Sequence, residues 1–501
     1  MPARRVPALV ALAVLAGLAV PEARASQHFV TRPDLEPPKV RIGTPAPAGV
    51  TGYVFTAPKG DTAQRGPMIF DNDGKLVWYR TVPEGESVLD FRVQSYLGKP
   101  VLTWWRGLPQ RGFGFGSVVI FDSSYRRIAT VRAKRGYKMD FHDFTLTPQG
   151  TALFDCYRRV HQDTRSIPGG SRRDRVLRNV IQEVDVKTGK LLFQWNANRH
   201  IHPRESFRPE PLRPHLPLDY IHLNSVDPDR DGNLIVSARE TSTIYKINRR
   251  TGRIMWRLGG KRSDYALARH AHFKYQHDAH RQRDGTITLF DNHAVSGGTK
   301  GQSSGLVLRL HDRTMTATKV RRYTSPRRQL AASEGNMQIL PDGHVFIGWG
   351  GNQRNVTEFA KGGRRVFEAL FVNRFIDTYR AYRFPWTAQP AEPPVAKARR
   401  SGGNTLVDVS WNGATEVAFW RVYGGTGATL LNRGWSGAPS AAFWMLGGTP
   451  AASASLVQRV TEPPTGFETR LTYAGSDGAV RVEALDADGN VIGHTRDVAV
   501  T

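Results

Sequence analysis

Cysteine is almost absent from this sequence. The only cysteine among 501 residues is Cys156, so no disulfide can form within the chain. Stability therefore depends on burial, and 11 Trp and 23 Phe provide enough apolar surface for a sizeable core. Cys156 lies in a strand-like apolar run, so we expect a buried structural side chain and not a nucleophile.

Helical periodicity and long apolar runs are also scarce. The one long apolar run, residues 6–20, follows Arg4 and Arg5 and precedes an A-x-A motif that ends at Ala25. These features are typical of a signal peptide over residues 1–25, which predicts a secreted or otherwise exported protein, extracellular or periplasmic. No later stretch is long and apolar enough to span a bilayer, so stable membrane insertion is not expected.

Acidic residues are few compared with basic ones. The chain has 70 Lys and Arg against 44 Asp and Glu, which gives a formal net charge of +26. The arginines are scattered and no nucleic-acid-binding motif is present, so no nucleic-acid partner is predicted. A basic surface can instead raise the local concentration of an anionic small-molecule substrate.

Composition divides the remaining chain into four parts. Residues 26–49 are rich in proline and indicate an extended N-terminal arm. Residues 50–390 alternate apolar residues with Asp, Asn and Gly turns, which is typical of strands. Residues 391–403 have the composition of a linker. Residues 404–501 suit a small fibronectin-III-like β-sandwich, a type of module that is suited to contact with cell-surface material.

Two interleaved series of hairpins run through residues 50–390. In one series a glycine opens an apolar strand, at Gly98, Gly150, Gly232, Gly285 and Gly343. In the other series the strands open near Gly74, Tyr125, Gly189, Gly252, Arg313 and Gly363. Two hairpins in each period of about 50 to 60 residues make one four-stranded unit. The pattern predicts an all-β fold, a six-bladed β-propeller followed by the sandwich module.

Three histidines occupy nearly the same place in successive units. His142 and His277 each lie eight residues before a hairpin glycine, and His222 lies ten before one. Repeats arranged around an axis bring such positions together. We therefore expect a cluster of three imidazoles at one mouth of the propeller channel.

Polar residues accompany these histidines. Asp143 and Asp278 directly follow two of them, and Asn224 lies two residues after His222. The strands that follow end in polar residues that antiparallel pairing returns to the same mouth, at Tyr157, Arg239 and Asn292. Imidazoles act as nucleophiles, acid–base groups or metal ligands, and an arginine suits an anionic, oxygen-rich group such as a sulfate.

Two other uses of the cluster stay open. The histidines could be structural in a non-catalytic binding or adhesion protein, or they could hold a metal in a hydrolase or oxidoreductase. No Glu or Cys joins the cluster and Arg239 would repel a cation, so we predict no metal and no cofactor. Three further histidines lack the repeat position and are expected in loops or at the surface, namely His270, His272 and His280.

Several ordered segments resemble the secreted branch of the bacterial arylsulfate sulfotransferase family. The similar segments are residues 219–225, 237–242, 256–260, 276–279, 333–336 and 346–350. The resemblance covers about residues 30–390. It implies a six-bladed propeller that moves a sulfuryl group from a phenolic sulfate ester to a phenolic acceptor without phosphoadenosine phosphosulfate (PAPS).

The resemblance also implies roles for individual residues. By motif, the nucleophile is His277, which would become a transient sulfohistidine, and the supporting histidines are His142 and His222. The family's arginine falls on Arg239, and its pocket-lining asparagine falls on Asn224. The chain departs from the family pattern because its extra module is C-terminal and because a disulfide near the site cannot form.

Overall fold

The structure is a computed structural model that describes residues 25–110, 112–207, 216–293, 301–425 and 457–501. Except for Ala25, the predicted signal peptide lies outside the described residues. The described elements are strands, together with the short 3-10 helices η2 (Ala197–Arg199) and η3 (Pro203–Glu205). Within these ranges, no helix has the length and apolar character needed to cross a bilayer.

Strands from the two ends of residues 50–390 share one sheet. In this sheet β26 (Ile376–Phe384) pairs with β2 (Tyr53–Gly60), and β3 (Met68–Phe70) and β4 (Leu76–Tyr79) follow. The pairing is antiparallel, with Tyr53 opposite Phe384. The last strand of the region therefore closes a ring with the first.

The next sheet holds two consecutive groups of four strands. Its strands are β5 (Ser87–Tyr96), β6 (Lys99–Pro109), β7 (Gly114–Phe121), β8 (Arg127–Val131), β9 (Lys138–Leu146), β10 (Thr151–Gln162), β11 (Asp174–Asp185) and β12 (Leu191–Asn196). A single pair, Gly116 with Met139, joins the two groups through β7 and β9.

Three further sheets continue the series. The first contains β13 (Leu223–Pro228), β14 (Leu234–Ala238), β15 (Thr243–Ile247) and β16 (Ile254–Gly259). The second contains β18 (His277–Arg281), β19 (Ile287–Asp291), β20 (Ser304–His311) and β21 (Thr316–Thr324), with β17 (Ala266–Leu267) added in parallel. The third contains β22 (Asn336–Ile339), β23 (Val345–Gly348), β24 (Asn355–Phe359) and β25 (Arg365–Phe371).

The predicted N-terminal arm contributes to this last sheet. Its segment β1 (Val40–Thr44) pairs antiparallel with β25. The alternation of half-buried and exposed residues along β1 is typical of an edge strand. The arm is therefore extended, as expected, and part of it is hydrogen-bonded to the ring.

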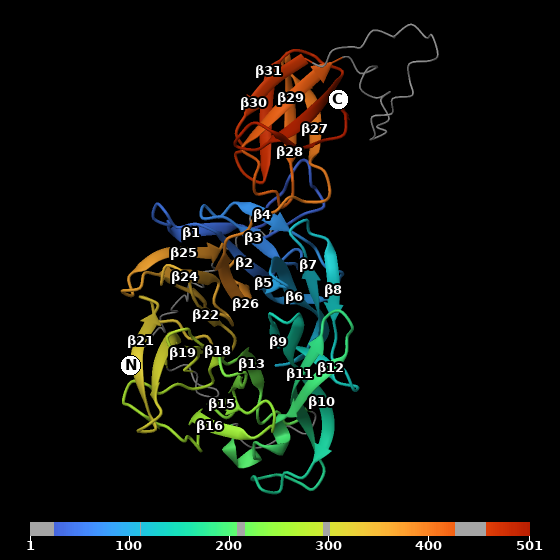
Figure 1. The fold of residues 1–501 in the computed structure, drawn as a ribbon. Coiled ribbons are helices and arrows are strands. Elements are labelled where there is room, and N and C mark those ends of the chain that lie inside the picture. Colours follow the sequence, from blue (N-terminus) through green and yellow to red (C-terminus); the bar gives the residue numbers. More distant parts are fainter. Residues whose placement is uncertain (1–24, 111, 208–215, 294–300, 426–456) are drawn as a thin grey trace, which may run out of the picture.

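The sheets are arranged around a common centre, as Figure 1 shows, so the fold is all-β and propeller-like. The first strands of the successive groups, β26, β5, β9, β13, β18 and β22, lie innermost and contact one another in turn. The cores lie between neighbouring sheets: Ile235 and Ile244 of one sheet pack with Ile287 and Leu289 of the next. Packing on both faces explains why the strands read as near-continuous apolar runs.

The C-terminal part forms two sheets of its own. One contains β27 (Val395–Ser401), β28 (Asn404–Ser410) and β31 (Glu468–Ala474). The other contains β30 (Val457–Glu462), β29 (Phe419–Gly425), β32 (Ala479–Leu485), β33 (Val491–His494) and β34 (Val498–Ala499). Strand β27 lies inside residues 391–403, which the sequence predicted as a linker. There the buried Ala396 and Ala398 alternate with exposed residues, a pattern that the basic composition hid.

Specific hydrogen bonds join the C-terminal sheets to the ring. The side chain of Asn412 pairs with the backbone of Tyr79 in β4, accepting from its N–H at 3.0 Å and donating to its carbonyl at 2.9 Å. The hydroxyl of Tyr125 donates to the carbonyl of Gly413 at 2.9 Å. In the arm, Thr31 bonds to Glu468 of β31. These contacts fix the side of the ring on which the C-terminal sheets stand (Figure 1).

Four inner strands carry an irregularity at equivalent places. The register shifts lie between Leu89 and Arg92 in β5, between Met139 and Phe144 in β9, between Leu223 and Ser225 in β13 and between His277 and His280 in β18. Such bulges re-aim side chains and are frequent beside active sites. The residues within these bulges include Asp90, Asp143, Asn224 and Asp278.

One arginine at the centre binds all four bulges. The guanidinium of Arg380, fully buried in β26, lies 3.3 Å from Asp90, 3.1 Å from Asp143 and 3.6 Å from Asp278. It also donates to the carbonyl of Asn224 at 2.9 Å. We call Arg380 and these three carboxylates the axial ion network. Because it connects four inner strands, β26, β5, β9 and β18, it sets the distances between them.

Replacing Arg380 by Met should destabilise the ring by about 3–5 kcal/mol, because three buried carboxylates lose the cation that they share and keep only Arg92 and His280 as partners. Urea unfolding followed by tryptophan fluorescence measures the change. Arg309→Met is the matched control, since Arg309 and Asp284 form an exposed pair at 3.7 Å. The control should cost less than about 1 kcal/mol. Equal losses in the two variants would contradict a structural role for the axial ion network.

Candidate active site

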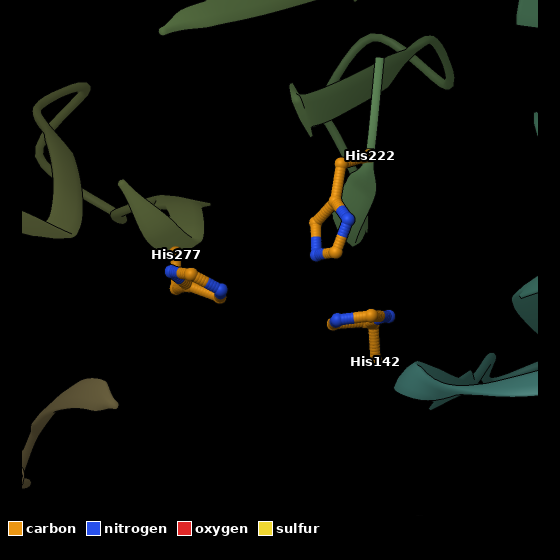
Figure 2. Close-up of side chains that lie close together, drawn as sticks. All are labelled: His142, His222 and His277. Carbon is orange, nitrogen blue, oxygen red and sulfur yellow. The ribbon is translucent and has the colours of Figure 1, made fainter. Parts of the chain in front are cut away.

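The three repeat-position histidines meet at one end of the ring. Figure 2 shows His142, His222 and His277 pointing toward one another, from β9, from the residue just before β13 and from β18. The ring centroids of His142 and His222 are 4.6 Å apart, and those of His142 and His277 are 6.4 Å apart. Each of the three residues offers a ring nitrogen within 4.8 Å of the others. The predicted convergence is therefore present in the structure.

His277 is the most deeply placed of the three, with only 1% of its surface exposed. Its Nδ1 lies 2.7 Å from Oδ1 of Asn292, and its Nε2 accepts the backbone N–H of Glu334 at 3.2 Å. Because an amide oxygen only accepts, the network assigns the proton to Nδ1 and leaves the lone pair on Nε2. Burial, followed by the nearby Arg239 guanidinium, holds the pKa of His277 well below 6.5.

His142 is held from behind by a carboxylate. Its Nδ1 and its backbone N–H both contact Oδ2 of Asp140, two residues earlier in β9. Phe141 packs against the His142 ring, with centroids 4.3 Å apart. Burial lowers the pKa of His142, although Asp140 opposes this shift.

His222 is oriented in a similar way. Its Nδ1 lies 2.8 Å from Oδ2 of Asp219, and its backbone N–H donates to Oδ1 of the same carboxylate at 3.0 Å. The residue has a φ of 57°, a left-handed conformation that costs energy for a side chain of this size. The Asp219 contacts offset that cost and hold the ring toward His142.

Arg239 follows β14 at the pocket wall. It donates to Oε1 of Glu240 at 2.5 Å and to the carbonyl of Ala332 at 2.9 Å. Its guanidinium lies 4.9 Å from the ring centroid of Tyr275, and its buried Nε has no hydrogen-bond partner among the described residues. The guanidinium lines the pocket beside the histidines, so it presents a positive charge to an anionic oxygen.

These groups form the polar floor of a pocket of about 500 Å³. The floor is made by His142, His222, His277 and Arg239, with Lys59 and Glu334 paired at 3.1 Å near them. The apolar wall is made by Leu89, Pro109, Phe113, Phe141, Leu177, Leu216 and Pro217. A cavity of this size with an apolar wall and a polar, charged floor suits an aromatic small molecule that carries a charged end.

The residues predicted to return to the pocket mouth are found near it. Asn292 holds His277, and Arg239 lines the pocket. Tyr157 is buried behind the site, with its ring 6.3 Å from that of His142 and its hydroxyl donating to the carbonyl of Leu223.

The polar companions differ from the expectation. Asp143 and Asp278 do not line the pocket, because the bulges turn them toward Arg380. Asn224 does not line it either: its side chain is fully buried and donates to the carbonyl of Gln276 at 2.7 Å. A single sequence cannot tell which side of a bulge a residue faces, because the alternation of strand faces breaks there.

His280 also differs from the expected loop or surface position. It lies within β18, 3.0 Å from Asp278 and 3.3 Å from Asp227. Burial opposes its charge, but the two carboxylates prevail and raise its pKa well above 6.5. His280 therefore belongs to the structural ion pairs around the axis and not to the pocket.

Sequence reasoning missed the groups that orient the histidines. Asp140 and Asp219 lie two and three residues before the histidines they hold, so an Asp-x-His and an Asp-x-x-His spacing were visible signals. The backbone N–H of Glu334 comes from a distant segment, and its contact with His277 has no local signal.

Comparison with known proteins places the site in a family. A model of the family described as "Arylsulfotransferase (ASST)" matches residues 92–372, which is more than half of the chain. The chain therefore belongs to the arylsulfotransferase family. This membership supports a sulfotransferase enzyme in general. No curated protein matches the chain.

Several solved structures are similar to this chain at low identity. A protein of unknown function from Bacteroides caccae matches with TM-score 0.41 and 13% identity, over 67% of this chain and 99% of its own. The periplasmic gluconolactonase of Pseudomonas aeruginosa matches with TM-score 0.36 and 13% identity, over 90% and 96%. The virginiamycin B lyase of Staphylococcus aureus matches with TM-score 0.34 and 10% identity, over 74% and 96%.

Replacing Arg239 by Gln should raise the pKa of His277. The substitution removes the nearby positive charge that disfavours the imidazolium form, while burial continues to lower the pKa. Nitrogen NMR of the labelled histidine rings, followed against pH, measures the change. Arg309→Gln, an exposed site on β20, should leave the His277 titration unchanged. An unchanged titration in Arg239→Gln would mean that this guanidinium does not act on His277.

Proposed function

We propose that this protein is a PAPS-independent aryl sulfotransferase, which moves a sulfuryl group from a phenolic sulfate ester to a phenolic acceptor through a sulfohistidine on His277. The observation that carries the proposal is the state of His277. Its Nε2 holds a lone pair at the floor of the pocket, between two carboxylate-oriented imidazoles and a guanidinium. Family membership and the apolar wall support the aryl sulfate class.

In the first half-reaction, Nε2 of His277 attacks sulfur and the bond between sulfur and the phenolic oxygen breaks. The hydrogen bond from Glu334 to Nε2 is given up as the lone pair turns to sulfur. A sulfate ester is a poor electrophile because its negative oxygens repel a nucleophile. Arg239, whose guanidinium lines the pocket, neutralises charge on these oxygens in the transition state.

In the second half-reaction, an acceptor phenol displaces His277 from sulfur. The leaving phenolate takes a proton from a group in the pocket during the first half-reaction. The acceptor phenol gives a proton back to that group during the second. His142 and His222 are the imidazoles within reach of both events. Two successive transfers on one covalent intermediate predict ping-pong kinetics.

The same proposal covers the architecture and location of the chain. We infer that the six consecutive groups of four strands, β26 with β2–β4 and the five that follow, are six propeller blades. The two C-terminal sheets are assigned as a fibronectin-III-like sandwich that is suited to contact with cell-surface material. The signal sequence supports export to the periplasm or the exterior.

A metal-dependent hydrolase or oxidoreductase is the second candidate. It is favoured by one observation, the presence of three imidazole nitrogens within 4.8 Å of one another. One observation opposes it: Arg239 adds a positive charge beside the cluster. A non-catalytic adhesion protein is the third candidate, and it requires no turnover at all.

Release of nitrophenolate from 4-nitrophenyl sulfate should depend on added phenol and should survive exhaustive chelation. His277→Ala should lower the rate about 10⁴-fold or more, because the nucleophile is lost. His161→Ala, at an exposed position on β10, is the control and should keep full activity.

Other outcomes identify the other candidates. Activity that disappears on chelation and returns with zinc would indicate the metal-dependent enzyme. The absence of release with every phenol tested would favour the binding protein, and release that needs no acceptor would indicate a sulfatase.

Arg239→Gln should lower kcat by about 10²–10³-fold, because a donor to the sulfuryl oxygens is lost in the transition state. The ester is already an anion before the attack, so KM should also rise, but by a smaller factor than kcat falls. A stopped-flow comparison of the wild type and the variant with 4-nitrophenyl sulfate measures both constants. A rise in KM at constant kcat would instead assign Arg239 to ground-state binding.

A further inference from the structure

The three imidazoles of the pocket all turn an acceptor toward one another. Nδ1 of His142 contacts the Asp140 carboxylate, and Nδ1 of His222 lies 2.8 Å from Oδ2 of Asp219. Because a carboxylate oxygen only accepts, each Nδ1 carries the ring proton, and Nε2 holds a lone pair while the ring is neutral. His277 has the same tautomer. The nitrogen that each ring turns toward the other two in Figure 2 is therefore an Nε2 with a lone pair.

The charged side chains of the pocket do not add up to a positive charge. In the described part of the chain its lining contains two cations, Lys59 and Arg239, and three carboxylates, Asp219, Glu240 and Glu334. Both cations are paired, Arg239 with Glu240 at 2.5 Å and Lys59 with Glu334 at 3.1 Å. While the imidazoles are neutral, a sulfate oxygen would meet three lone pairs and a lining without surplus positive charge. Oxygens of an anion need donors instead.

Two of the three rings are built to take a proton. The carboxylates behind His142 and His222 favour an imidazolium, because a nearby negative charge stabilises the charged form. The group behind His277 is the neutral amide of Asn292, and burial together with Arg239 holds the pKa of His277 well below 6.5. The ring centroids of His142 and His222 are only 4.6 Å apart, so two imidazoliums would repel each other. The pair therefore has room for one proton.

The free pocket does not hold this proton firmly. The charged groups around the pair are Asp140 in β9, Asp155 in β10, Asp219 before β13, Arg239 and Glu240 after β14, and Arg380 in β26. Burial lowers the pKa of His142, and His222 and Arg380 add to this shift while Asp140 opposes it. A bound anion brings one more negative charge next to Nε2, which favours the imidazolium.

Building on the proposed sulfuryl transfer, we propose that the pocket binds an oxyanion together with one proton from the solvent, which settles on an Nε2 of the His142–His222 pair. A sulfate oxygen then meets an N–H in place of a lone pair. The imidazolium formed on binding is the acid that the leaving phenolate needs.

The protons balance over one catalytic cycle. The solvent proton enters with the sulfate ester and passes from the pair to the phenolic oxygen as the bond between sulfur and that oxygen breaks. Nε2 of His277 forms the new bond to sulfur, and its Nδ1–H stays in place. The acceptor phenol then returns a proton to the pair as its oxygen attacks sulfur and the bond from sulfur to His277 breaks. This proton leaves with the product ester, and Asp140 and Asp219 stay ionised throughout.

Benzenesulfonate tests the binding step by itself, because its carbon–sulfur bond does not take part in the transfer. Calorimetric titrations in Bis-Tris and in Tris, two buffers that differ in ionisation enthalpy and are not oxyanions, count the protons. We expect an uptake of about one proton per ligand and an affinity that falls about tenfold per unit of rising pH, over the range where the free pair is neutral. Methyl phenyl sulfone, a neutral ligand of similar shape, should bind without uptake.

Replacing both rings of the pair by glutamine tests where the proton goes. A glutamine amide donates an N–H at any pH, so His142→Gln/His222→Gln should bind benzenesulfonate without proton uptake and with a pH-independent affinity. Glu334 is the competing site, because it lines the pocket and burial raises its pKa. Glu334→Gln should therefore keep the uptake.

Nitrogen NMR of the labelled wild-type rings provides the same test without a substitution, in case the double variant does not fold. In the complex with benzenesulfonate, one ring of the His142–His222 pair should carry N–H at both nitrogens. Nε2 of His277 should remain without a proton.

The remaining outcomes overturn the proposal or separate it from the proposed function. Loss of the uptake in Glu334→Gln would place the proton on the carboxyl group. Binding that disappears on chelation and returns with zinc would mean that the lone pairs hold a metal. Binding without any uptake would mean that Arg239 compensates the anion alone. Proton-linked binding without turnover of phenyl sulfate would support this proposal and overturn sulfuryl transfer.

Discussion

The guanidinium of Arg380 is fully enclosed, and the rest of the ring depends on how its charge is compensated. Three carboxylates from different inner strands lie within 3.6 Å of it, and the carbonyl of Asn224 accepts from it. A buried charge is tolerated only when it is paired and hydrogen-bonded. The inner strands must therefore stand at the distances that satisfy Arg380. The spacing of the histidines above it is a consequence of the same constraint.

The bulges connect this network to the pocket. His142 and His277 face the pocket, while the residues directly after them, Asp143 and Asp278, face Arg380. In a regular strand two neighbouring residues point to opposite faces. A bulge adds a residue, so that here the histidine faces the pocket and the aspartate after it faces Arg380. The imidazoles that face the pocket and the carboxylates that face Arg380 are therefore neighbours in the sequence. The axial ion network holds the backbone of these residues, and it thereby also holds the histidines in place.

Electrostatics then separates the roles of similar side chains. His280 lies between two carboxylates and favours its charged form, whereas His277, three residues earlier, is buried beside Arg239 and favours its neutral form. A nucleophile has to be neutral and a structural counter-ion has to be charged. The +26 net charge of the chain adds a general attraction for anionic substrates, while the pocket itself offers one guanidinium and an apolar wall.

The repeat spacing of hairpins and histidines was enough to predict an all-β ring and the meeting of His142, His222 and His277, because period and alternation are local properties of a chain. Asp140 and Asp219, which hold two of these rings, lay within three residues of them and were within the reach of sequence reasoning. The partners of Arg380, the contact of Glu334 with His277 and the buried position of Asn224 were decided only by the tertiary structure. Each of them depends on which way a bulge turns or on segments more than 50 residues apart in the sequence, and no local pattern encodes either.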